Sequence, residues 1–354
     1  MTGIDTLSAL LESSGMITCF FDMGRRIRRI PTPEFSAIES GHRPYPTPLL
    51  RAAWLGVLHY SSQDVQTNTI WFLRLPVDDE GMLDPAARDD LLFHLLEELG
   101  RHAHSGQEQA PASDSGQGNN PYGFSPRQEY LAVFHAQAAR VLGQPPSRFY
   151  AHAREYLAGA QGYEQWSCVG MQGIADVGAR LDQDDNRERL LGAMARLPVR
   201  PLEALCQCLE HQSIDRALAA AIIRRIREPI AIDEPAAPLL ALAIRAISGC
   251  RDPDLVRQLV TSSLEQEIAD SPEVLAAIMA RAWKVLEDPA IRQGYLLRLA
   301  ENSAGQRVFN AVISDALGLP GLRALIQAEL RGPGRPETLT RAIGGLFNVV
   351  HDKA

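Results

Sequence analysis

The chain has 354 residues, of which 45% are hydrophobic, and a formal net charge of −8 at pH 7. This length suits two or three domains, and this composition allows a sizeable core. The chain contains no run of about 18 apolar residues and no Lys or Arg in residues 1–11, so we expect neither a membrane span nor a secretory signal.

The charges and cysteines narrow the class of protein further. Residues 1–104 carry 9 Arg and 14 Asp or Glu, and residues 121–354 carry 26 basic and 27 acidic residues, so neither part is globally basic. Bulk attraction to nucleic acid is therefore not expected. Only Lys284 and Lys353 of the 35 basic residues are lysine, which is typical of a GC-rich genome. Five scattered cysteines favour a reducing compartment, and we expect the cytoplasm.

The first hundred residues show a mixed pattern of short strands and helices. β-branched and aromatic residues predict strands, a capping residue before proline predicts a helix start, and the polar stretch after Tyr60 predicts a long hairpin loop. The expected strands are 16–22, 25–30, 54–60 and 69–75, and the expected helices are 4–11, 33–40 and one that begins at Pro85. These elements predict a small antiparallel sheet with helices on one face.

Residues 103–120 contain no large apolar side chain. Such a segment cannot bury enough apolar surface to offset the entropy of ordering it, so it is expected to be a flexible linker. We expect an α+β domain at 1–102, the linker at 103–120, and a helical region at 121–354.

The region after the linker has helical periodicity almost to its end. Ser125 to Gln128 has the form of a capping box, and Asp252-Pro253, Ser271-Pro272 and Asp288-Pro289 each place a capping residue before proline. Pro235 and Pro272 are 37 residues apart, and Pro253 and Pro289 are 36 apart. This spacing predicts an all-α, HEAT-like array of helix pairs, with an irregular bundle as the alternative.

Several familiar sites fail on their spacing. The chain has no phosphate-binding glycine loop, no catalytic serine motif and no HExxH. Cys206 and Cys208 point about 200° apart on a helix, which argues against a zinc site and for buried packing. The Asp182 to Asn186 segment lacks the glycine and glutamate of a calcium loop, and we expect it to cap the next helix. We therefore expect no metal and no cofactor.

An arginine-rich segment follows Asp22 directly. It contains Arg25, Arg26, Arg28 and Arg29, and in a strand the first and last of these would share a face. One interpretation is a docking site for an acidic or phosphate-bearing partner. The other is a solvated edge strand whose charges prevent edge-to-edge pairing.

A glycine-rich segment begins at Gly162 and contains Tyr163 and Trp166, followed by glycines at 170, 173 and 178. Glycines at this spacing allow helices to approach closely, which favours a packing role. The alternative is a groove lined by Tyr163 and Trp166.

Five segments taken together resemble a known family. They are FDMGRRIRRI at 21–30, RPYPTPLLRAAWLGVL at 43–58, IWFLRLPVDDEGMLDPAARD at 70–89, NPYGFSP at 120–126 and GYEQWSCVGMQGIADVGARL at 162–181. They are similar to a family of uncharacterised proteobacterial proteins that share a domain of unknown function. The resemblance implies a bacterial cytosolic protein and supplies no catalytic residue.

The sequence favours a non-enzymatic adaptor or scaffold that binds a protein partner, with an acidic partner as one option. The reason is that helical arrays commonly present extended binding surfaces. The first alternative is nucleic-acid binding through arginines such as Arg224, Arg225 and Arg227. The second is an enzyme of unrecognised type that uses the Asp22–Arg26 region. No membrane partner is expected, and the oligomeric state stays open.

Overall fold

The computed structural model describes residues 6–105, 120–160, 162–227 and 236–351. Their contacts divide the chain into two compact units. Unit 1 comprises residues 1–127 and 317–323, and unit 2 comprises residues 128–316 and 324–354. Among the described residues, no helix is both long enough and apolar enough to cross a membrane.

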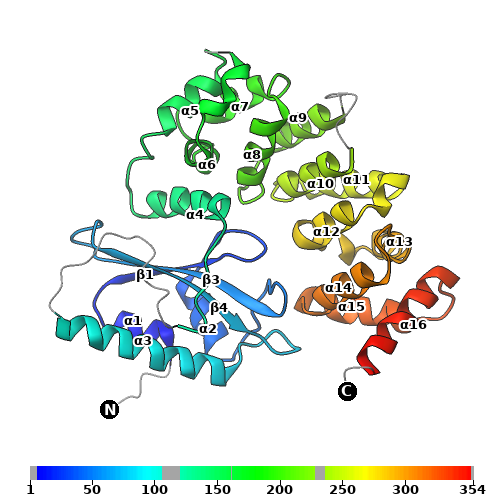
Figure 1. Cartoon of the computed structure of the whole chain (residues 1–354), viewed down its shortest axis with the longest axis horizontal. Coiled ribbons are helices and arrows are strands. Elements are labelled where there is room, and N and C mark those ends of the chain that lie inside the picture. The colour runs from blue at the N-terminus through cyan, green and yellow to red at the C-terminus, as the bar shows by residue number, and fades with distance from the viewer. Residues whose placement is uncertain (1–5, 106–119, 161, 228–235, 352–354) are drawn as a thin grey trace. The chain divides into compact units, whose positions relative to one another are not determined.

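Unit 1 contains a four-stranded antiparallel sheet with the strand order β2-β1-β3-β4 (Figure 1). The strands are β1 (Ile17–Asp22), β2 (Arg28–Ile30), β3 (Ala52–Tyr60) and β4 (Asn68–Pro76). In the register, Phe20 of β1 pairs with Ile30 of β2 and with Val57 of β3, which in turn pairs with Trp71 of β4. The predicted small antiparallel sheet is therefore confirmed.

Three helices cover one face of this sheet: α1 (Leu7–Glu12), α2 (Thr32–Glu39) and α3 (Pro85–Ser105). Their apolar side chains and those of the strands form one buried cluster. At its centre the rings of Phe20 and Phe35 stack with centroids 3.9 Å apart. Asp84 caps α3 through hydrogen bonds that its carboxylate accepts from the backbone N–H groups of Ala86 and Ala87, as the sequence predicts.

Residues 122–124, near the end of the first part of unit 1, pair with strand β4 of the sheet. The N–H of Phe124 donates to the carbonyl of Phe72, and the N–H of Arg74 donates to the carbonyl of Tyr122. The first helix of unit 2 begins at Gln128, the last residue of the segment expected to form a capping box. Most of the predicted linker, residues 103–120, lies outside the described residues, and α3 extends to Ser105.

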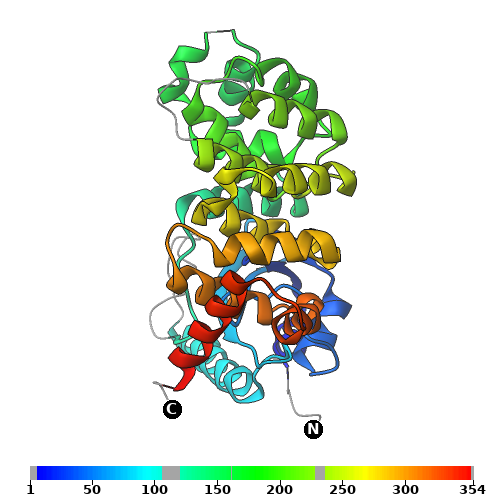
Figure 2. The same ribbon diagram turned by 90° about the vertical axis from the view of Figure 1, so that its right-hand side faces the viewer.

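Unit 2 is helical, as predicted, and its first ten helices form two rows (Figures 1 and 2). Each helix contacts the next helix of its own row. Row 1 contains α4 (Gln128–Val141), α6 (Met171–Ala179), α8 (Val199–Leu209), α10 (Ala236–Ile247) and α12 (Pro272–Arg281). Row 2 contains α5 (Tyr150–Leu157), α7 (Asn186–Ala193), α9 (Arg216–Arg227), α11 (Pro253–Leu264) and α13 (Pro289–Ala300). The 3₁₀ helices are η2 (Tyr163–Cys168), η3 (Glu267–Asp270) and η4 (Trp283–Glu287), and the last helices are α14 (Gln306–Leu317), α15 (Pro320–Arg331) and α16 (Glu337–His351).

The repeat of unit 2 is clearest in row 2, where successive helices begin 36, 30, 37 and 36 residues apart. The last of these intervals is the spacing from Pro253 to Pro289 that is visible in the sequence. Asp252 and Asp288 accept hydrogen bonds from the first turns of α11 and α13, while Ser271 makes no such bond at the start of α12. Pairs of helices stacked in two rows are the arrangement expected of a helical-repeat array.

Candidate functional site

The arginine segment does not form one continuous exposed strand. β2 begins only at Arg28, and Arg25 lies in the preceding turn, where it is buried and its Nε donates to the carbonyl of Pro48 at 2.9 Å. Arg25 and Arg29 therefore do not share the face that a regular strand would give them. Arg26 is half-buried, and Arg28 and Arg29 are exposed next to each other on β2. A docking role for this segment stays a prediction.

Asp22 is fully enclosed at the end of β1 and holds this turn together. Its carboxylate accepts hydrogen bonds from the N–H of Gly24 at 2.8 Å and from the hydroxyl of Thr47 at 2.6 Å. The guanidinium of Arg28 lies 3.9 Å from the same carboxylate. Burial raises the pKa of Asp22 above its usual range, against the opposing effect of these hydrogen bonds. These contacts tie the end of β1 to the segment that contains Thr47.

The two aromatic residues of the glycine-rich segment have different surroundings. Tyr163 is buried, its ring packs edge-on against Tyr156, and its hydroxyl donates to the carbonyl of Leu157 at 3.3 Å. Trp166 is 41% exposed. The structure therefore places only Trp166 on the surface.

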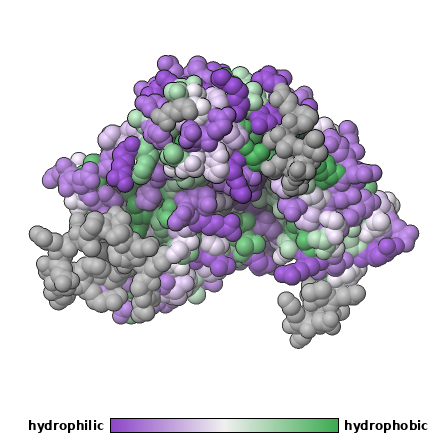
Figure 3. Space-filling model, turned by 45° about the horizontal axis from the view of Figure 1, so that its top comes forward, coloured by the Kyte–Doolittle hydropathy of each residue, from purple (hydrophilic) through white to green (hydrophobic). Residues whose placement is uncertain are grey.

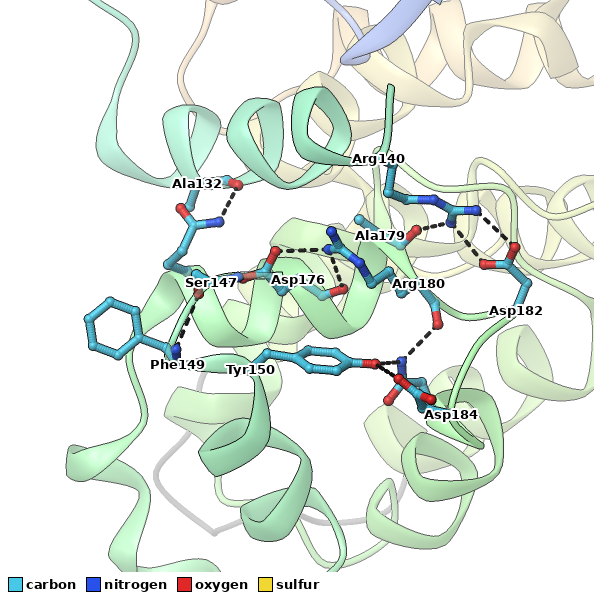
Figure 4. Close-up of polar contacts among 12 residues, drawn as sticks. Ala132, Arg140, Ser147, Phe149, Tyr150, Asp176, Ala179, Arg180, Asp182 and Asp184 are labelled. Atoms are coloured by element: carbon cyan, nitrogen blue, oxygen red, sulfur yellow. Dashed lines mark hydrogen bonds and ion pairs between the residues drawn. The ribbon is translucent and has the colours of Figure 1, made fainter. Parts of the chain in front are cut away.

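Gly173 serves close packing, as one of the two interpretations of this segment predicts. A Cβ atom at this position would lie 2.6 Å from the carbonyl oxygen of Phe149 and 2.9 Å from the Cβ of Ala153. The start of α5 therefore lies directly against α6. In Figure 4 the ring of Phe149 points away from the Asp176–Arg180 ion pair, and the residue is 43% exposed.

The cysteines of α8 are buried, and among the described residues no group of three or more metal-ligating side chains forms a cluster. Burial raises the pKa of the Cys206 thiol to about 12 and moves that of Cys208 upward too. At this pKa the Cys206 thiol stays protonated at neutral pH, and it is the thiolate that binds metal.

A polar network joins α4, α5, α6 and the loop before α7 (Figure 4). At its centre Asp176 and Arg180 form an ion pair of 2.9 Å between two side chains that are at most 3% exposed. The second carboxylate oxygen of Asp176 accepts from the N–H of Ser147 at 3.1 Å. The pair thus fixes the chain segment that enters α5 onto α6.

The loop before α7 is held by a second part of this network. The hydroxyl of Tyr150 donates to Asp184 at 2.8 Å, and the side-chain amide of Asn186 donates to that hydroxyl and to the carbonyl of Arg180. Asp184 and Asp185 have φ angles of 52° and 55°. The expected capping of α7 by these acidic side chains is wrong, because the N-cap Asp185 makes no side-chain hydrogen bond to the helix.

A pocket of about 350 Å³ opens beside this network, where α4 and three successive interhelical loops of unit 2 meet. Its lining includes Arg140 and Asp182, which form a bidentate ion pair with two contacts of 2.8 Å. The hydrogen bonds from Arg140 hold the pKa of Asp182 below its usual range. Arg187 and Asp215 form a second ion pair in the lining. This pocket is the candidate binding site of unit 2.

Asp215 is a residue that the sequence analysis missed, although its signal is present. Asp215, Asp252 and Asp288 precede α9, α11 and α13 at intervals of 37 and 36 residues, and each accepts a backbone hydrogen bond from its helix. Arg187 pairs with Asp215, and Arg216 pairs with Asp252 one repeat later. The capping residues therefore also link neighbouring helices of row 2.

A second charged cluster lies within row 1. Glu210 follows α8 and is buried, with Arg281 of α12 at 2.8 Å and Arg245 of α10 at 3.3 Å. Arg281 also donates to the hydroxyl of Tyr130 of α4 at 2.5 Å. The cluster joins four helices of the row, so we assign it to the stability of the array.

Two of the three arginines of α9 that suggested nucleic-acid binding donate hydrogen bonds to other parts of unit 2. Arg225 donates to the carbonyl of Leu197 at 2.9 Å, and Arg227 donates to the hydroxyl of Ser262. Hydrophilic residues predominate on the face shown in Figure 3, and apolar residues form small separate patches there.

Comparison with known proteins gives a family but no activity. No curated protein and no solved structure matches the chain. The model of a family described as "Protein of unknown function (DUF3549)" matches residues 2–347, which confirms the resemblance to a family of unknown function. The chain belongs to the DUF3549 family.

Proposed function

We propose that this protein is a non-enzymatic scaffold whose unit 2 binds an acidic segment of a protein partner. The observation that carries the proposal is the pair of exposed aromatic side chains, Phe149 and Trp166, on adjoining segments of the array. Phe149 reaches within 4.0 Å of the Cβ position of Gly170, four residues beyond Trp166. Exposed aromatic side chains are frequent anchors of protein interfaces.

The charge beside these aromatic residues favours an acidic partner. The guanidinium of Arg148 lies 4.9 Å from the centroid of the Phe149 ring, and that of Arg196 lies 5.2 Å from the centroid of the Tyr163 ring. Within the described part of the chain, neither guanidinium forms an ion pair. Both therefore keep donors for a carboxylate, which arginine binds with strong charge-assisted hydrogen bonds.

We also infer that the protein acts in the cytoplasm of a bacterium. All five cysteines are free. Free cysteines suit a reducing compartment.

The proposal is tested by removing both aromatic side chains and comparing the proteins captured from cells that produce this chain. We expect the double variant Phe149→Ala, Trp166→Ala to capture at least tenfold less of the partner than the wild type does, because the partner loses its apolar anchors. Phe93→Ala, at a phenylalanine of α3 that is 57% exposed, is the matched control and should retain the signal. If the double variant folds and captures the same proteins as the wild type, the proposal is wrong.

A further inference from the structure

We propose that the pocket of unit 2 binds a small organic anion through one carboxylate or phosphate group. The site is separate from the aromatic residues that carry the proposed function and does not depend on a protein partner. Its volume of about 350 Å³ lies at the small end of the range of about 300–1,000 Å³ that is usual for ligand pockets.

The charge balance of the lining favours an anion. Three guanidinium groups, those of Arg140, Arg187 and Arg251, line the pocket with the carboxylates of Asp182 and Asp215. The two aspartates already pair with the first two arginines. Arg251 forms no ion pair among the described residues, and its Nε donates only to the hydroxyl of Ser213 at 3.2 Å. Arg187 also pairs with Glu188, which is not part of the lining, so of the three arginines only Arg251 is without an ionic partner in the described part of the chain.

The hydrogen-bond donors of the lining favour an oxyanion. The side-chain nitrogen of Gln212 is enclosed and has no hydrogen-bond partner in the described part of the structure. Leaving such a donor without a partner costs about 1–3 kcal/mol. A carboxylate or phosphate oxygen in the pocket would accept from the guanidinium of Arg251, which belongs to the loop of the neighbouring repeat, and from this amide once the Gln212 side chain turns toward the pocket.

A cationic ligand fits the same lining poorly. Asp182 and Asp215 would have to give up the guanidinium groups that they bind, and the hydrogen bonds from Arg140 keep Asp182 ionised by lowering its pKa. Any cation that entered would also meet the charge of Arg251. The guanidinium of Arg251, which has no ionic partner among the residues that the structure describes, and the amide donor of Gln212 therefore both favour a negatively charged ligand.

The test is isothermal titration calorimetry of the full chain with inorganic phosphate and with succinate, at constant ionic strength set by potassium chloride. We expect at least one of the two probes to bind with a Kd of about 1 mM or below, as suits one charged group. Arg251→Gln should weaken that binding at least tenfold. Arg257→Gln, at an exposed arginine of α11 that pairs with Asp254 and is not part of the lining, should change it less than twofold.

A second variant distinguishes the pocket from a general effect of charge. Gln212→Glu keeps the size of the side chain but adds a carboxylate to the lining that contains Arg251, so it should abolish binding of the probe and leave the chain folded. The proposal is overturned if neither phosphate nor succinate binds to the wild type at about 10 mM, or if Arg257→Gln weakens binding as much as Arg251→Gln does. Neither result depends on whether the aromatic residues bind a protein.

Discussion

The two units bury their carboxylates in different ways. In unit 1, Glu39 accepts hydrogen bonds from the backbone N–H groups of Leu7 and Ser8, and Asp22 accepts from a backbone N–H and a hydroxyl. In unit 2, Asp176 and Glu210 are buried against arginines. Unit 1 thus holds its buried carboxyl groups mainly with neutral donors, and unit 2 holds them mainly with opposite charges.

This difference follows from the parts of the chain that the buried carboxyl groups connect in each unit. The carboxylate of Glu39 in α2 accepts the N–H groups at the start of α1, so it acts as a cap supplied by another helix. In unit 2 the charged pairs fix loops and helices that belong to successive repeats, where a long arginine side chain can span the gap. We therefore expect unit 1 to respond to pH through Glu39, and unit 2 to respond most to the loss of a charged partner.

The largest expected effect is the loss of the buried ion pair in unit 2. Asp176→Asn leaves the guanidinium of Arg180 charged and enclosed, so we expect the free energy of unfolding to fall by about 3–5 kcal/mol. Urea unfolding followed by circular dichroism measures this loss. Asp182→Asn, at the more exposed pair with Arg140, is the control and should cost about 0–1 kcal/mol. Equal losses for the two variants would show that burial does not distinguish the pairs.

The second effect concerns Glu39 and its dependence on pH. Burial raises the pKa of this carboxyl in the folded protein to about 7, above the ordinary value of 4.5 that applies after unfolding. The folded state therefore holds the proton more tightly, and the stability that this group contributes is lost as the pH rises from about 5 to about 8. We expect a loss of about 1–3 kcal/mol across this interval.

Comparing wild type with Glu39→Gln isolates this contribution. The glutamine oxygen can still accept a hydrogen bond from α1 but does not titrate, so the variant should be the more stable protein at pH 8 and lose that advantage at pH 5. Glu34→Gln, on the same helix, is the control. Parallel stability curves for wild type and Glu39→Gln between pH 5 and pH 8 would contradict the prediction.

The third effect tests how tightly the rows of unit 2 pack. Gly173→Ala places a Cβ within 2.6 Å of the Phe149 carbonyl, so α5 and α6 must separate, and we expect a cost of about 1–3 kcal/mol. Gly192→Ala in α7 meets no atom within 4 Å and should stabilise the protein by about 0.5–1 kcal/mol. Thermal unfolding distinguishes the two, and a neutral Gly173→Ala would mean that the helices are not in close contact.

Much of the fold could be predicted from the sequence because its signals are local. β-branched, aromatic and other apolar residues place β1, β3 and β4 to within two residues, and prolines after capping residues mark the starts of α11, α12 and α13. The prediction failed where a non-local contact decides the structure. Residues 25–30 are expected to form one strand, but Arg25 donates to the carbonyl of Pro48 in the turn, and β2 begins only at Arg28.

The candidate site was harder to predict, for the same physical reason. Arg140 and Asp182 are 42 residues apart, and Glu210 and Arg281 are 71 apart, so neither pair forms a recognisable motif. Arg251 and Gln212 lie in loops of successive repeats, and only the folded structure brings both residues into the lining of one pocket. The regular spacing of Asp215, Asp252 and Asp288, at 37 and 36 residues, is a signal in the sequence that marks the loops before the helices of row 2.

The smallest expected effect concerns two residues that each precede a proline at the start of a helix. One of them caps its helix with hydrogen bonds, and the other does not. Asp288 accepts hydrogen bonds from the N–H groups of Ala290 at 2.9 Å and Ile291 at 3.2 Å, so Asp288→Ala should lower the free energy of unfolding by about 1 kcal/mol. Ser271 precedes proline in the same way, but its hydroxyl donates to Glu273 and accepts no N–H group of α12. Ser271→Ala should therefore change stability by less than about 0.5 kcal/mol. Urea unfolding of both variants measures the difference, and equal losses would mean that the array uses every serine or aspartate before proline as a cap, whatever its hydrogen bonds.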